Sequence, residues 1–332
     1  MKPIHVGLVA DPAAPSKMAR RISDLDPPTE EDRGAWDFEV VTEPFTVGCE
    51  DADTALGRLG DKSRQHEWDL VIGLTELPLR DDDGRYLLVQ SDPRRHTAVV
   101  SLPALGGLRM HARSRHAVRK LVGGLTGPTS PDGHRVPLPR LGGRWRLLVG
   151  MVLANRPWLL VPGLKSALVA ALATGAVATI NSTVWLLAGS LSWWRLTVAT
   201  VASIGMVVAW LVIDGELWDR PDDDSPEARD RSRLYNLSTL LTLTTGVLIC
   251  YLALYVVNLL WALFVLDPAV MGGYLHSSLG YGDLFVLAWF VASAATVGGG
   301  LGTGLESDEA IRAAAYSKRE EERRNRLAQE RT

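Results

Sequence analysis

Cysteine and lysine are both scarce in this sequence. Only two of its 332 residues are cysteines, and only six of its 35 cationic residues are lysines. Cys49 lies in a polar stretch and Cys250 in an apolar run, so the two are poorly placed to pair, and free thiols are typical of a reducing compartment. The segment Met1–Ala10 is too short for the apolar core of a secretory signal peptide. We therefore expect the first domain to stay in the cytoplasm.

Several motifs that carry chemistry are also missing. The first half of the chain contains no Gly-rich phosphate loop, no CxxC pair and no nucleophile elbow. The formal net charge is −3, and no basic stripe alternates with aromatic residues, which argues against a nucleic-acid partner. We predict no catalytic residue, no metal site and no cofactor, and the sequence leans towards a protein that is not an enzyme.

What the sequence does contain is four long stretches without charge. Each is close to or above the ~18–20 residues that a helix needs to cross ~30 Å of hydrocarbon. They contain no Asp, Glu, Lys, Arg or His, which argues against a pump or a proton-coupled transporter. The sequence predicts an all-α bundle of four transmembrane helices in residues 164–305, over Ser166–Gly189, Leu196–Ile213, Leu237–Leu266 and Leu284–Leu305.

The positions of Lys and Arg predict how these helices are oriented. Cationic residues resist transfer across the membrane, so short cation-rich loops stay in the cytoplasm. Cations precede the first stretch, lie between the second and third, and follow the fourth, whereas the loop Asp267–Asp283 has none. We expect a multi-pass protein of the bacterial inner (plasma) membrane, with both termini in the cytoplasm and a charged helical tail over residues 306–332.

One further apolar segment, Trp145–Gly163, is interrupted by Asn155, Arg156 and Pro157. An arginine beside a helix-breaking proline is costly in lipid. We predict that this segment is an interfacial helix or the last strand of the soluble domain, and that residues 127–163 form a Pro/Gly-rich linker and interfacial segment. A fifth span here would instead place the N-terminal domain outside.

Small residues recur four apart within the apolar stretches. Such spacing lets two helices approach closely in lipid. It predicts tight packing or a homo-oligomer, and Asn181 and Asn258 are expected to bond to neighbouring helices. The small pairs are Ala171 with Gly175, Gly298 with Gly302, and Gly300 with Gly304.

The segment Ser278–Asp283, with the sequence SLGYGD, resembles the selectivity filter of potassium channels. Such a filter presents backbone carbonyls that replace the water shell of the ion. The resemblance implies a pore at Gly280, Tyr281, Gly282 and Asp283. The channel family has a pore helix before its filter, whereas Asp267–Ser277 contains one proline and two glycines and is predicted to be a poor helix. A Gly-rich outer turn is the alternative.

Residues 1–126 alternate between strand and helix patterns, which predicts a soluble α/β domain. Five strands are expected at Ile4–Ala10, Phe38–Val47, Asp69–Leu74, Arg85–Gln90 and Thr97–Leu102. Helices are expected at Pro15–Leu25, Ala52–His66 and Leu108–Leu125.

Polar side chains follow three of the predicted strands. In α/β sheets ligands gather beyond the carboxyl ends of parallel strands. Asp11, Thr75, Glu76 and Ser101 are therefore candidates to line one binding crevice. The alternative is that these side chains cap turns and helices.

The stretches WDLVIGLTELPL and TAVVSLPALGG, followed by a helix that carries His116, resemble the archaemetzincin branch of zinc-dependent peptidases. Such peptidases hold zinc with two histidines one helical turn apart and use an adjacent glutamate as the general base. Here Ala117 stands at the glutamate position and Lys120 at the second histidine, while Gly123 matches. The resemblance implies an inactive, zincin-like fold that lacks the zinc ligands.

The whole chain, and its segment LESDEAIRAAAYSKREEERR in particular, resembles multipass membrane proteins of high-GC bacteria whose role is not assigned. Our leading hypothesis is a cytoplasmic α/β domain that binds a protein or small-molecule partner and is coupled to a bundle that anchors or oligomerises in the lipid bilayer. A channel built on Gly280–Asp283 and an inactive relative of membrane-bound zinc peptidases are the alternatives.

Overall fold

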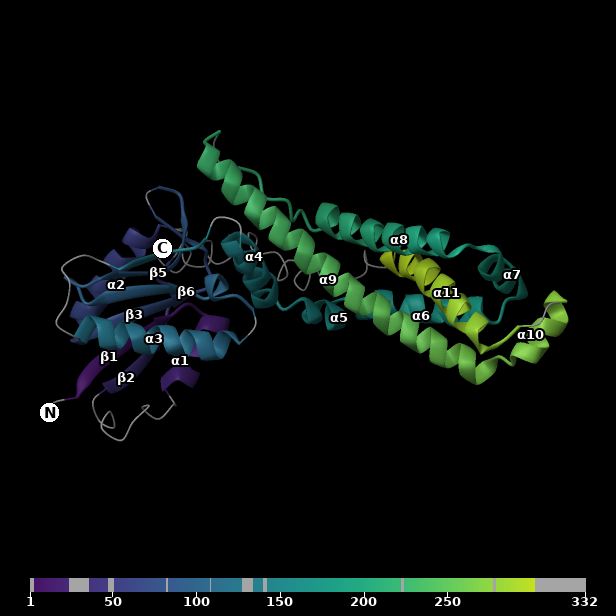
Figure 1. The fold of residues 1–332 in the computed structure, drawn as a ribbon, viewed down its shortest axis with the longest axis horizontal. Helices are drawn as coiled ribbons and strands as arrows, with labels where there is room; N and C mark the ends of the chain where they lie inside the picture. Colours follow the sequence, from purple (N-terminus) through teal and green to yellow (C-terminus); the bar gives the residue numbers. More distant parts are fainter. Residues whose placement is uncertain are drawn as a thin grey trace. The chain divides into compact units, whose positions relative to one another are not determined.

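The chain divides into two compact units, the first formed mainly by Met1–Ala154 and the second mainly by Asn155–Asp224 and Ala228–Arg319 (Figure 1). The computed structural model describes residues 3–23, 36–46, 51–81, 83–107, 109–126, 134–139, 142–221, 224–276 and 279–301. The predictions for Cys49, Gly302, Gly304 and the tail over residues 306–332 lie outside the described residues.

The first unit is built on one seven-stranded sheet with the order β2-β1-β3-β6-β5-β4, in which β7 pairs with β5. Strands β1, β2, β3 and β6 are parallel, and β5 runs antiparallel to β6, β4 and β7. The predicted α/β class of this part is confirmed. The strands are β1 (Ile4–Ala10), β2 (Trp36–Thr42), β3 (Leu70–Thr75), β4 (Leu79–Arg80), β5 (Tyr86–Asp92), β6 (Thr97–Ser101) and β7 (Arg135–Pro137).

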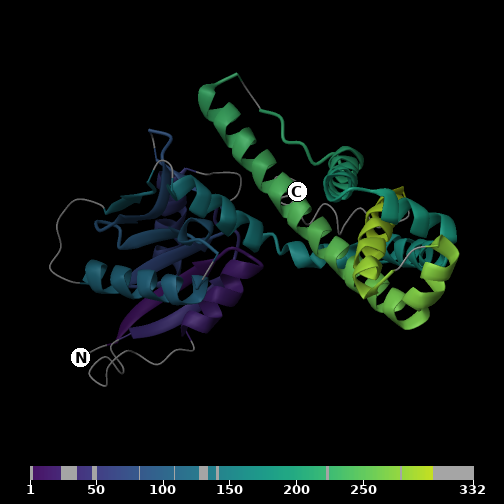
Figure 2. The same ribbon diagram turned by 45° about the vertical axis from the view of Figure 1, so that its right-hand side comes forward.

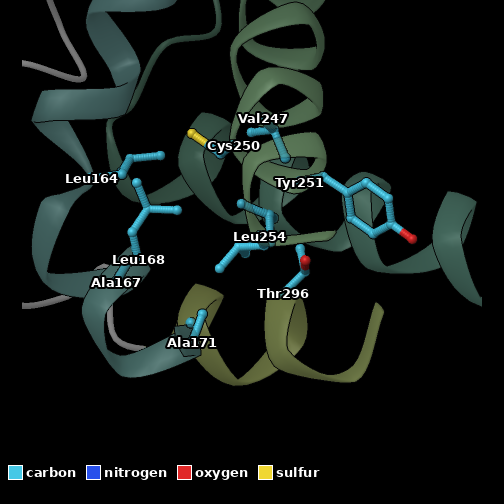
Figure 3. A pocket seen from close by; sticks show the side chains of 11 residues that line it. Leu164, Ala167, Leu168, Ala171, Val247, Cys250, Tyr251, Leu254 and Thr296 are labelled. Carbon is cyan, nitrogen blue, oxygen red and sulfur yellow. The ribbon is translucent and has the colours of Figure 1, made fainter. Parts of the chain in front are cut away.

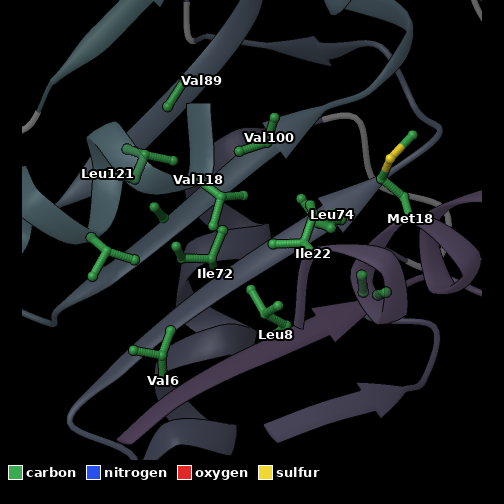
Figure 4. Packing of buried hydrophobic residues seen from close by; sticks show 14 of the residues in the cluster. Val6, Leu8, Met18, Ile22, Ile72, Leu74, Val89, Val100, Val118 and Leu121 are labelled. Carbon is green, nitrogen blue, oxygen red and sulfur yellow. The ribbon is translucent and has the colours of Figure 1, made fainter. Parts of the chain in front are cut away.

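Helices cover both faces of this sheet. α1 (Ala14–Ser23) and α3 (Met110–Thr126) pack on one face, and α2 (Ala52–His66) packs on the other. Figure 4 shows Val118 and Leu121 of α3 close to Ile72 and Val100 of the sheet. In α3 the buried apolar residues are spaced three or four apart, so they form one face of the helix and leave the adjacent face free of the core.

The first unit continues beyond α3. β7 extends the sheet, and α4 (Gly142–Ala154) packs on the short 3-10 helix η1 (Pro103–Leu105). A side chain at Gly150 would overlap the carbonyl oxygen of Pro103, so glycine permits this close approach. Of the two forms predicted for Trp145–Gly163, a helix rather than a strand is present up to Ala154.

The second unit is helical throughout its described residues. Figure 2 shows its longest helix, α9, as one unbroken element. The elements are η2 (Pro157–Leu159), α5 (Leu160–Gly163), α6 (Lys165–Thr179), α7 (Ser182–Ser190), α8 (Trp193–Asp214), α9 (Pro226–Val265), α10 (Pro268–Leu275) and α11 (Tyr281–Leu301).

The prediction of one helix over Ser166–Gly189 is wrong, because the chain breaks between α6 and α7. Asn181 has an extended backbone, and its side-chain oxygen accepts a hydrogen bond from the backbone N–H of Thr183 at 2.9 Å. It thus caps α7 instead of bonding to a neighbouring helix. Asn258 bonds within its own helix, to the carbonyl of Leu254 at 2.8 Å. The segment after α9 was predicted to be a poor helix, yet Asp267 caps α10 there.

Three helices in the described part of the chain are long and apolar enough to cross a membrane: α8, α9 and α11. By the same length and hydropathy criteria, Gly142–Gly163 and Lys165–Thr179, which meet at an angle of 55°, make a fourth candidate if they are counted as one bent span. The chain is therefore compatible with a membrane protein, although the predicted bundle of four continuous helices is not what forms.

Small residues bring α6 and α11 of the same chain together. A side chain at Gly299 would lie 2.8 Å from the carbonyl oxygen of Ala167 and 2.9 Å from Cβ of Ala171. Gly298 faces Thr174 of α6 more loosely. Association of two chains through Gly298 and Gly300 stays a prediction.

A cluster of hydroxyl groups joins α8, α9 and α11. Thr200 lies 3.2 Å from the Tyr251 hydroxyl and 3.1 Å from that of Ser293, and the last two are 3.0 Å apart. The indole N–H of Trp289 donates to Thr200 at 2.7 Å. Hydrogen bonds between helices stabilise apolar bundles, because lipid offers no alternative partner.

We predict that Tyr251→Phe lowers the free energy of unfolding of the second unit by about 1 kcal/mol, since one member of this cluster loses its hydroxyl. Unfolding by sodium dodecyl sulfate in mixed micelles, followed by circular dichroism, measures the change. Tyr274→Phe is the matched control, because Tyr274 is 70% exposed and its hydroxyl has no hydrogen-bond partner in the described residues. Equal losses in the two variants would contradict the prediction.

Candidate functional site

The four residues predicted to line a crevice lie at the carboxyl edge of the sheet, but three of them are fully buried. The carboxylate of Asp11 accepts hydrogen bonds from the hydroxyl groups of Thr75, at 2.6 Å, and Thr46, at 2.7 Å. Ser101 donates to the carbonyl of Leu77 at 2.8 Å, and Glu76 accepts from the backbone N–H of Ala14 at 3.1 Å. The structure thus joins Asp11 to Thr75 and directs Ser101 and Glu76 to neighbouring backbone groups.

The residues of the predicted pore loop form the start of a helix. Tyr281, Gly282 and Asp283 lie in the first turn of α11, directly after Gly280. The Asp283 carboxylate accepts a hydrogen bond from the backbone N–H of Gly280 at 2.8 Å, in the manner of a helix cap. The pore hypothesis stays a prediction to which this geometry adds no support.

A small cavity lies within the second unit, between α6, α8, α9 and α11. Its volume is about 30 Å³, and Figure 3 shows Leu164, Leu168 and Leu254 around it, with the thiol of Cys250 at its edge. A water molecule needs roughly two to four polar partners to occupy such a space. The two hydroxyls in its described lining are already bonded, Tyr251 to Thr200 and Ser293 and Thr296 to the carbonyl of Ala292, so this small apolar cavity is a packing defect rather than a binding site.

A much larger hollow lies along α3 in the first unit, and we call it the basic groove. Its volume is about 880 Å³, within the usual range of roughly 300–1,000 Å³ for small-molecule sites. α3 forms one wall, and β5, β7, η1 and α4 supply the rest. It is lined by Leu88, Val89, Ser91, Pro93, Leu105, Arg109, Ala112, Arg113, His116, Ala117, Lys120, Leu121, Gly124, Leu125, His134, Val136 and Arg146.

The floor of the basic groove follows from an irregularity in β5. The pairing of β5 with β7 shifts register between Leu87 and Val89, so one extra residue enters the strand there. Leu87 packs against the α2 side of the sheet, whereas Leu88 and Val89 both pack on the α3 side. Two consecutive apolar side chains thereby face the same wall as Val136 of β7.

The cations of the basic groove come from a single stripe of α3 and from α4. Arg113, His116 and Lys120 are three or four residues apart in α3, so they project from one side of the helix, and Arg109 directly precedes it. Arg109 adopts a left-handed backbone, with φ at 54°, which costs a non-glycine residue about 1 kcal/mol. His116 and Lys120, singled out by the resemblance to zinc peptidases, are thus two members of a basic stripe.

No carboxylate neutralises this stripe in the part of the chain that the structure describes. The described residues that line the groove include no Asp or Glu. None of its arginine, lysine or histidine side chains forms an ion pair with a described residue. Nor do the described residues contain a group of three His, Cys, Asp or Glu side chains placed to hold a metal ion.

Two arginines meet at the η1 end of the groove. Around Gly106, whose φ of 80° favours glycine, Nη1 of Arg113 and Nε of Arg146 lie 3.1 and 3.4 Å from the position that a Cβ would occupy, so these nitrogens are within about 6.5 Å of each other. Arg113 donates to the carbonyl of Leu105 at 2.7 Å, but the buried Nε of Arg146 has no partner in the described residues. Burial and the charge of Arg113 lower the pKa of Arg146.

The groove was missed in the sequence, although a signal for it is present. Between Pro93 and Lys165 there are thirteen lysines and arginines and one acidic residue, Asp132. α3 itself contains no Asp or Glu, so no carboxylate of the same helix lies one turn from its cations. What the sequence does not reveal is the register shift in β5 and the docking of α4, which turn a basic helix into a groove.

No family model matches the chain, and no curated protein or solved structure matches it. Since a fold does not by itself define a function, the chemistry of the groove is the best guide to what this protein binds.

We predict that Gly150→Ala displaces α4, because the new methyl group would overlap the Pro103 carbonyl, and that Arg146 moves with it. Backbone amides of residues 144–153 should exchange with deuterium at least tenfold faster than in the wild type, as measured by mass spectrometry on the full chain. Gly142→Ala in the same helix is the control, since nothing lies within 4 Å of its added methyl group. Unchanged exchange in Gly150→Ala would show that the contact does not hold α4.

Proposed function

We propose that this protein is a multi-pass protein of the bacterial inner membrane whose α/β unit lies in the cytoplasm and binds a small anionic ligand in the basic groove. The observation that carries the proposal is a groove of about 880 Å³ whose described lining has four permanent cations and no carboxylate. The apolar helices of the second unit anchor the protein in the lipid bilayer.

The membrane assignment is supported by the surface of the helical unit. α8, α9 and α11 meet the length and hydropathy needed to span a bilayer, and large apolar side chains such as Val201 and Leu260 are 66% and 60% exposed. Trp193, Trp194 and Trp218 are exposed at or just beyond the ends of α8, where indole rings favour the headgroup layer. We propose that α6 and α7 together make a fourth, broken crossing.

The orientation is supported by the distribution of charge. The thirteen cations between Pro93 and Lys165 precede the first crossing, and the loop Asp267–Asp283 has no Lys or Arg. Cation-rich segments near the ends of spans stay in the cytoplasm. With four crossings both termini lie on that side.

The anionic class of the ligand is supported by the charges and burial in the basic groove. The guanidinium groups of Arg113 and Arg146 repel one another at close range, and the partial burial of Arg146 strengthens that repulsion. An anion that binds between them removes the repulsion and accepts charge-assisted hydrogen bonds worth about 1.5–3 kcal/mol each.

We predict that the full chain in phosphatidylcholine nanodiscs binds hexyl phosphate at one saturable site and binds hexanol at least tenfold more weakly, because the phosphate meets the groove arginines. Arg146→Gln and Arg113→Gln should each weaken hexyl phosphate about ten- to hundredfold, which matches the loss of one charged hydrogen-bonding partner. Equilibrium dialysis measures the affinities, with empty nanodiscs giving the background.

The matched control is Arg115→Gln. Arg115 lies on the same helix but does not line the groove, so its removal takes the same charge away and should change the affinity less than threefold. Equal losses of affinity in Arg115→Gln and Arg113→Gln would show that the loss comes from the overall positive charge of α3 and not from a contact in the groove. The absence of saturable binding would refute the proposed ligand site.

The orientation is tested with single cysteines and a membrane-impermeant thiol reagent on intact cells, in a background with Cys250 replaced by alanine. Cys49 and cysteines at Ser130, Ser190, Ser225, Ser277 and Ser317 probe the successive segments. We expect labelling at positions 190 and 277 alone. Labelling at positions 49 and 130 would place the α/β unit outside and overturn the cytoplasmic assignment.

A further inference from the structure

We infer that the anion bound in the basic groove is a phosphate monoester that carries one aliphatic chain, such as a lysophospholipid with a terminal phosphate. The inference rests on the proposed function, because it names the chemical class of the ligand for the same groove. It follows from three properties of the lining: where its cations are concentrated, what its floor is made of, and which side chains it does not offer.

The head of the ligand belongs at the η1 end, where Arg113 and Arg146 come together and the groove is also lined by Arg109. Nη1 of Arg113 and Nε of Arg146 are within about 6.5 Å of each other, so one anion can contact the accessible parts of both guanidinium groups. A phosphate monoester carries up to two negative charges and three free oxygens at neutral pH, against one charge and two oxygens for a carboxylate. The dianion matches three guanidinium groups better.

The aliphatic chain of the ligand is expected to lie along the rest of the groove, whose floor is aliphatic. Leu88, Val89 and Val136 of the sheet face Leu121 and Leu125 of α3 across this part. From Arg113 to Leu125 the helix rises about 18 Å, at ~1.5 Å per residue. An acyl chain that reaches the middle of a bilayer is about 15 Å long, since the hydrocarbon core is ~30 Å thick. One such chain therefore fits the length of the groove.

The lining argues against a nucleotide, the other common ligand with a phosphate and a large apolar part. No Phe, Tyr or Trp among the described lining residues provides a face on which a base stacks. No Asn, Gln, Asp or Glu is present there to bond with base edges or ribose hydroxyls. A flat polar base placed over the aliphatic floor of Leu88, Val89 and Val136 would turn its hydrogen-bonding groups towards apolar side chains, which is costly.

The test is a chain-length series of methyl, butyl and hexyl phosphate, measured by equilibrium dialysis on the full chain in phosphatidylcholine nanodiscs. Empty nanodiscs give the partition background. Each added methylene should raise the affinity about threefold, slightly below the ~fourfold of complete burial. Adenosine monophosphate should bind no tighter than methyl phosphate.

Two kinds of variant distinguish the contacts made by the phosphate head of the ligand from those made by its aliphatic chain. Arg146→Gln should weaken every member of the series by the same factor of ten or more, because it acts on the phosphate. The double variant Leu88→Ser, Val136→Ser should leave methyl phosphate within twofold of the wild type and reduce the gain from methyl to hexyl at least tenfold. Both residues are only partly buried, so the substitutions spare the core. Val41→Ser, a partly buried valine of β2 on the opposite side of the sheet, is the control.

The outcomes distinguish this inference from the function on which it rests. Equal affinities of methyl and hexyl phosphate, with a loss in Arg146→Gln, would overturn the aliphatic chain and leave an anion site. Tighter binding of adenosine monophosphate than of hexyl phosphate would replace the lipid with a nucleotide. The absence of saturable phosphate binding would overturn both proposals.

Discussion

Helix α4 reaches the backbone of η1 because Gly150 has no side chain at the point of closest approach. The basic groove depends on this contact, since Arg146 lies one turn before Gly150 and comes to Arg113 only when α4 is in place. Gly106 also allows Arg113 and Arg146 to come together, because it has no side chain between them and its backbone conformation suits glycine. Without that contact Arg146 would not lie beside Arg113, and the concentration of positive charge at the first turns of α3 would be lower.

The electrostatic cost of the arrangement is appreciable. Two unit charges about 6.5 Å apart repel by roughly 2–3 kcal/mol at an effective dielectric constant of about 20. Natural domains are stable by only about 5–15 kcal/mol in total, so a like-charged pair without a carboxylate is a notable fraction of that margin. Structural ion networks usually contain both signs of charge. A surplus of one sign in a concave, partly apolar place is more typical of a site that is completed by a ligand.

How much of this follows from the sequence differs between the two units. Ala52–His66 and Ile4–Ala10 are found as predicted, because their apolar residues repeat with the period of a helix or a strand and their ends carry turn or cap signals. The break at Asn181 was not predicted, since an asparagine in an apolar run reads equally well as a helix residue or as a cap. α10 was underestimated because proline suits the first turn of a helix, behind an Asp cap, as well as a loop.

For the candidate site the limits are different. The sequence places Asp11, Thr75, Glu76 and Ser101 correctly at the ends of strands, but only the packing of Thr46 and Phe45 over Asp11 reveals that its oxygens bond within the chain. The absence of carboxylates from α3 can be read directly from the sequence. The wall that α4 adds to the basic groove cannot, because it depends on a contact between segments about forty residues apart. Local pattern gives the chemistry of each surface, and tertiary packing decides which surfaces face each other.

The length of α9 has a mechanical consequence. Its 40 residues extend about 60 Å, roughly twice the thickness of the hydrocarbon layer, and its charged residues are confined to the first turns. In the proposed membrane arrangement, one end of this stiff rod is held in lipid while the other stands in water. A tilt of only 10° about the embedded end carries the aqueous end through about 10 Å, so small adjustments among closely packed helices become large movements outside the bilayer.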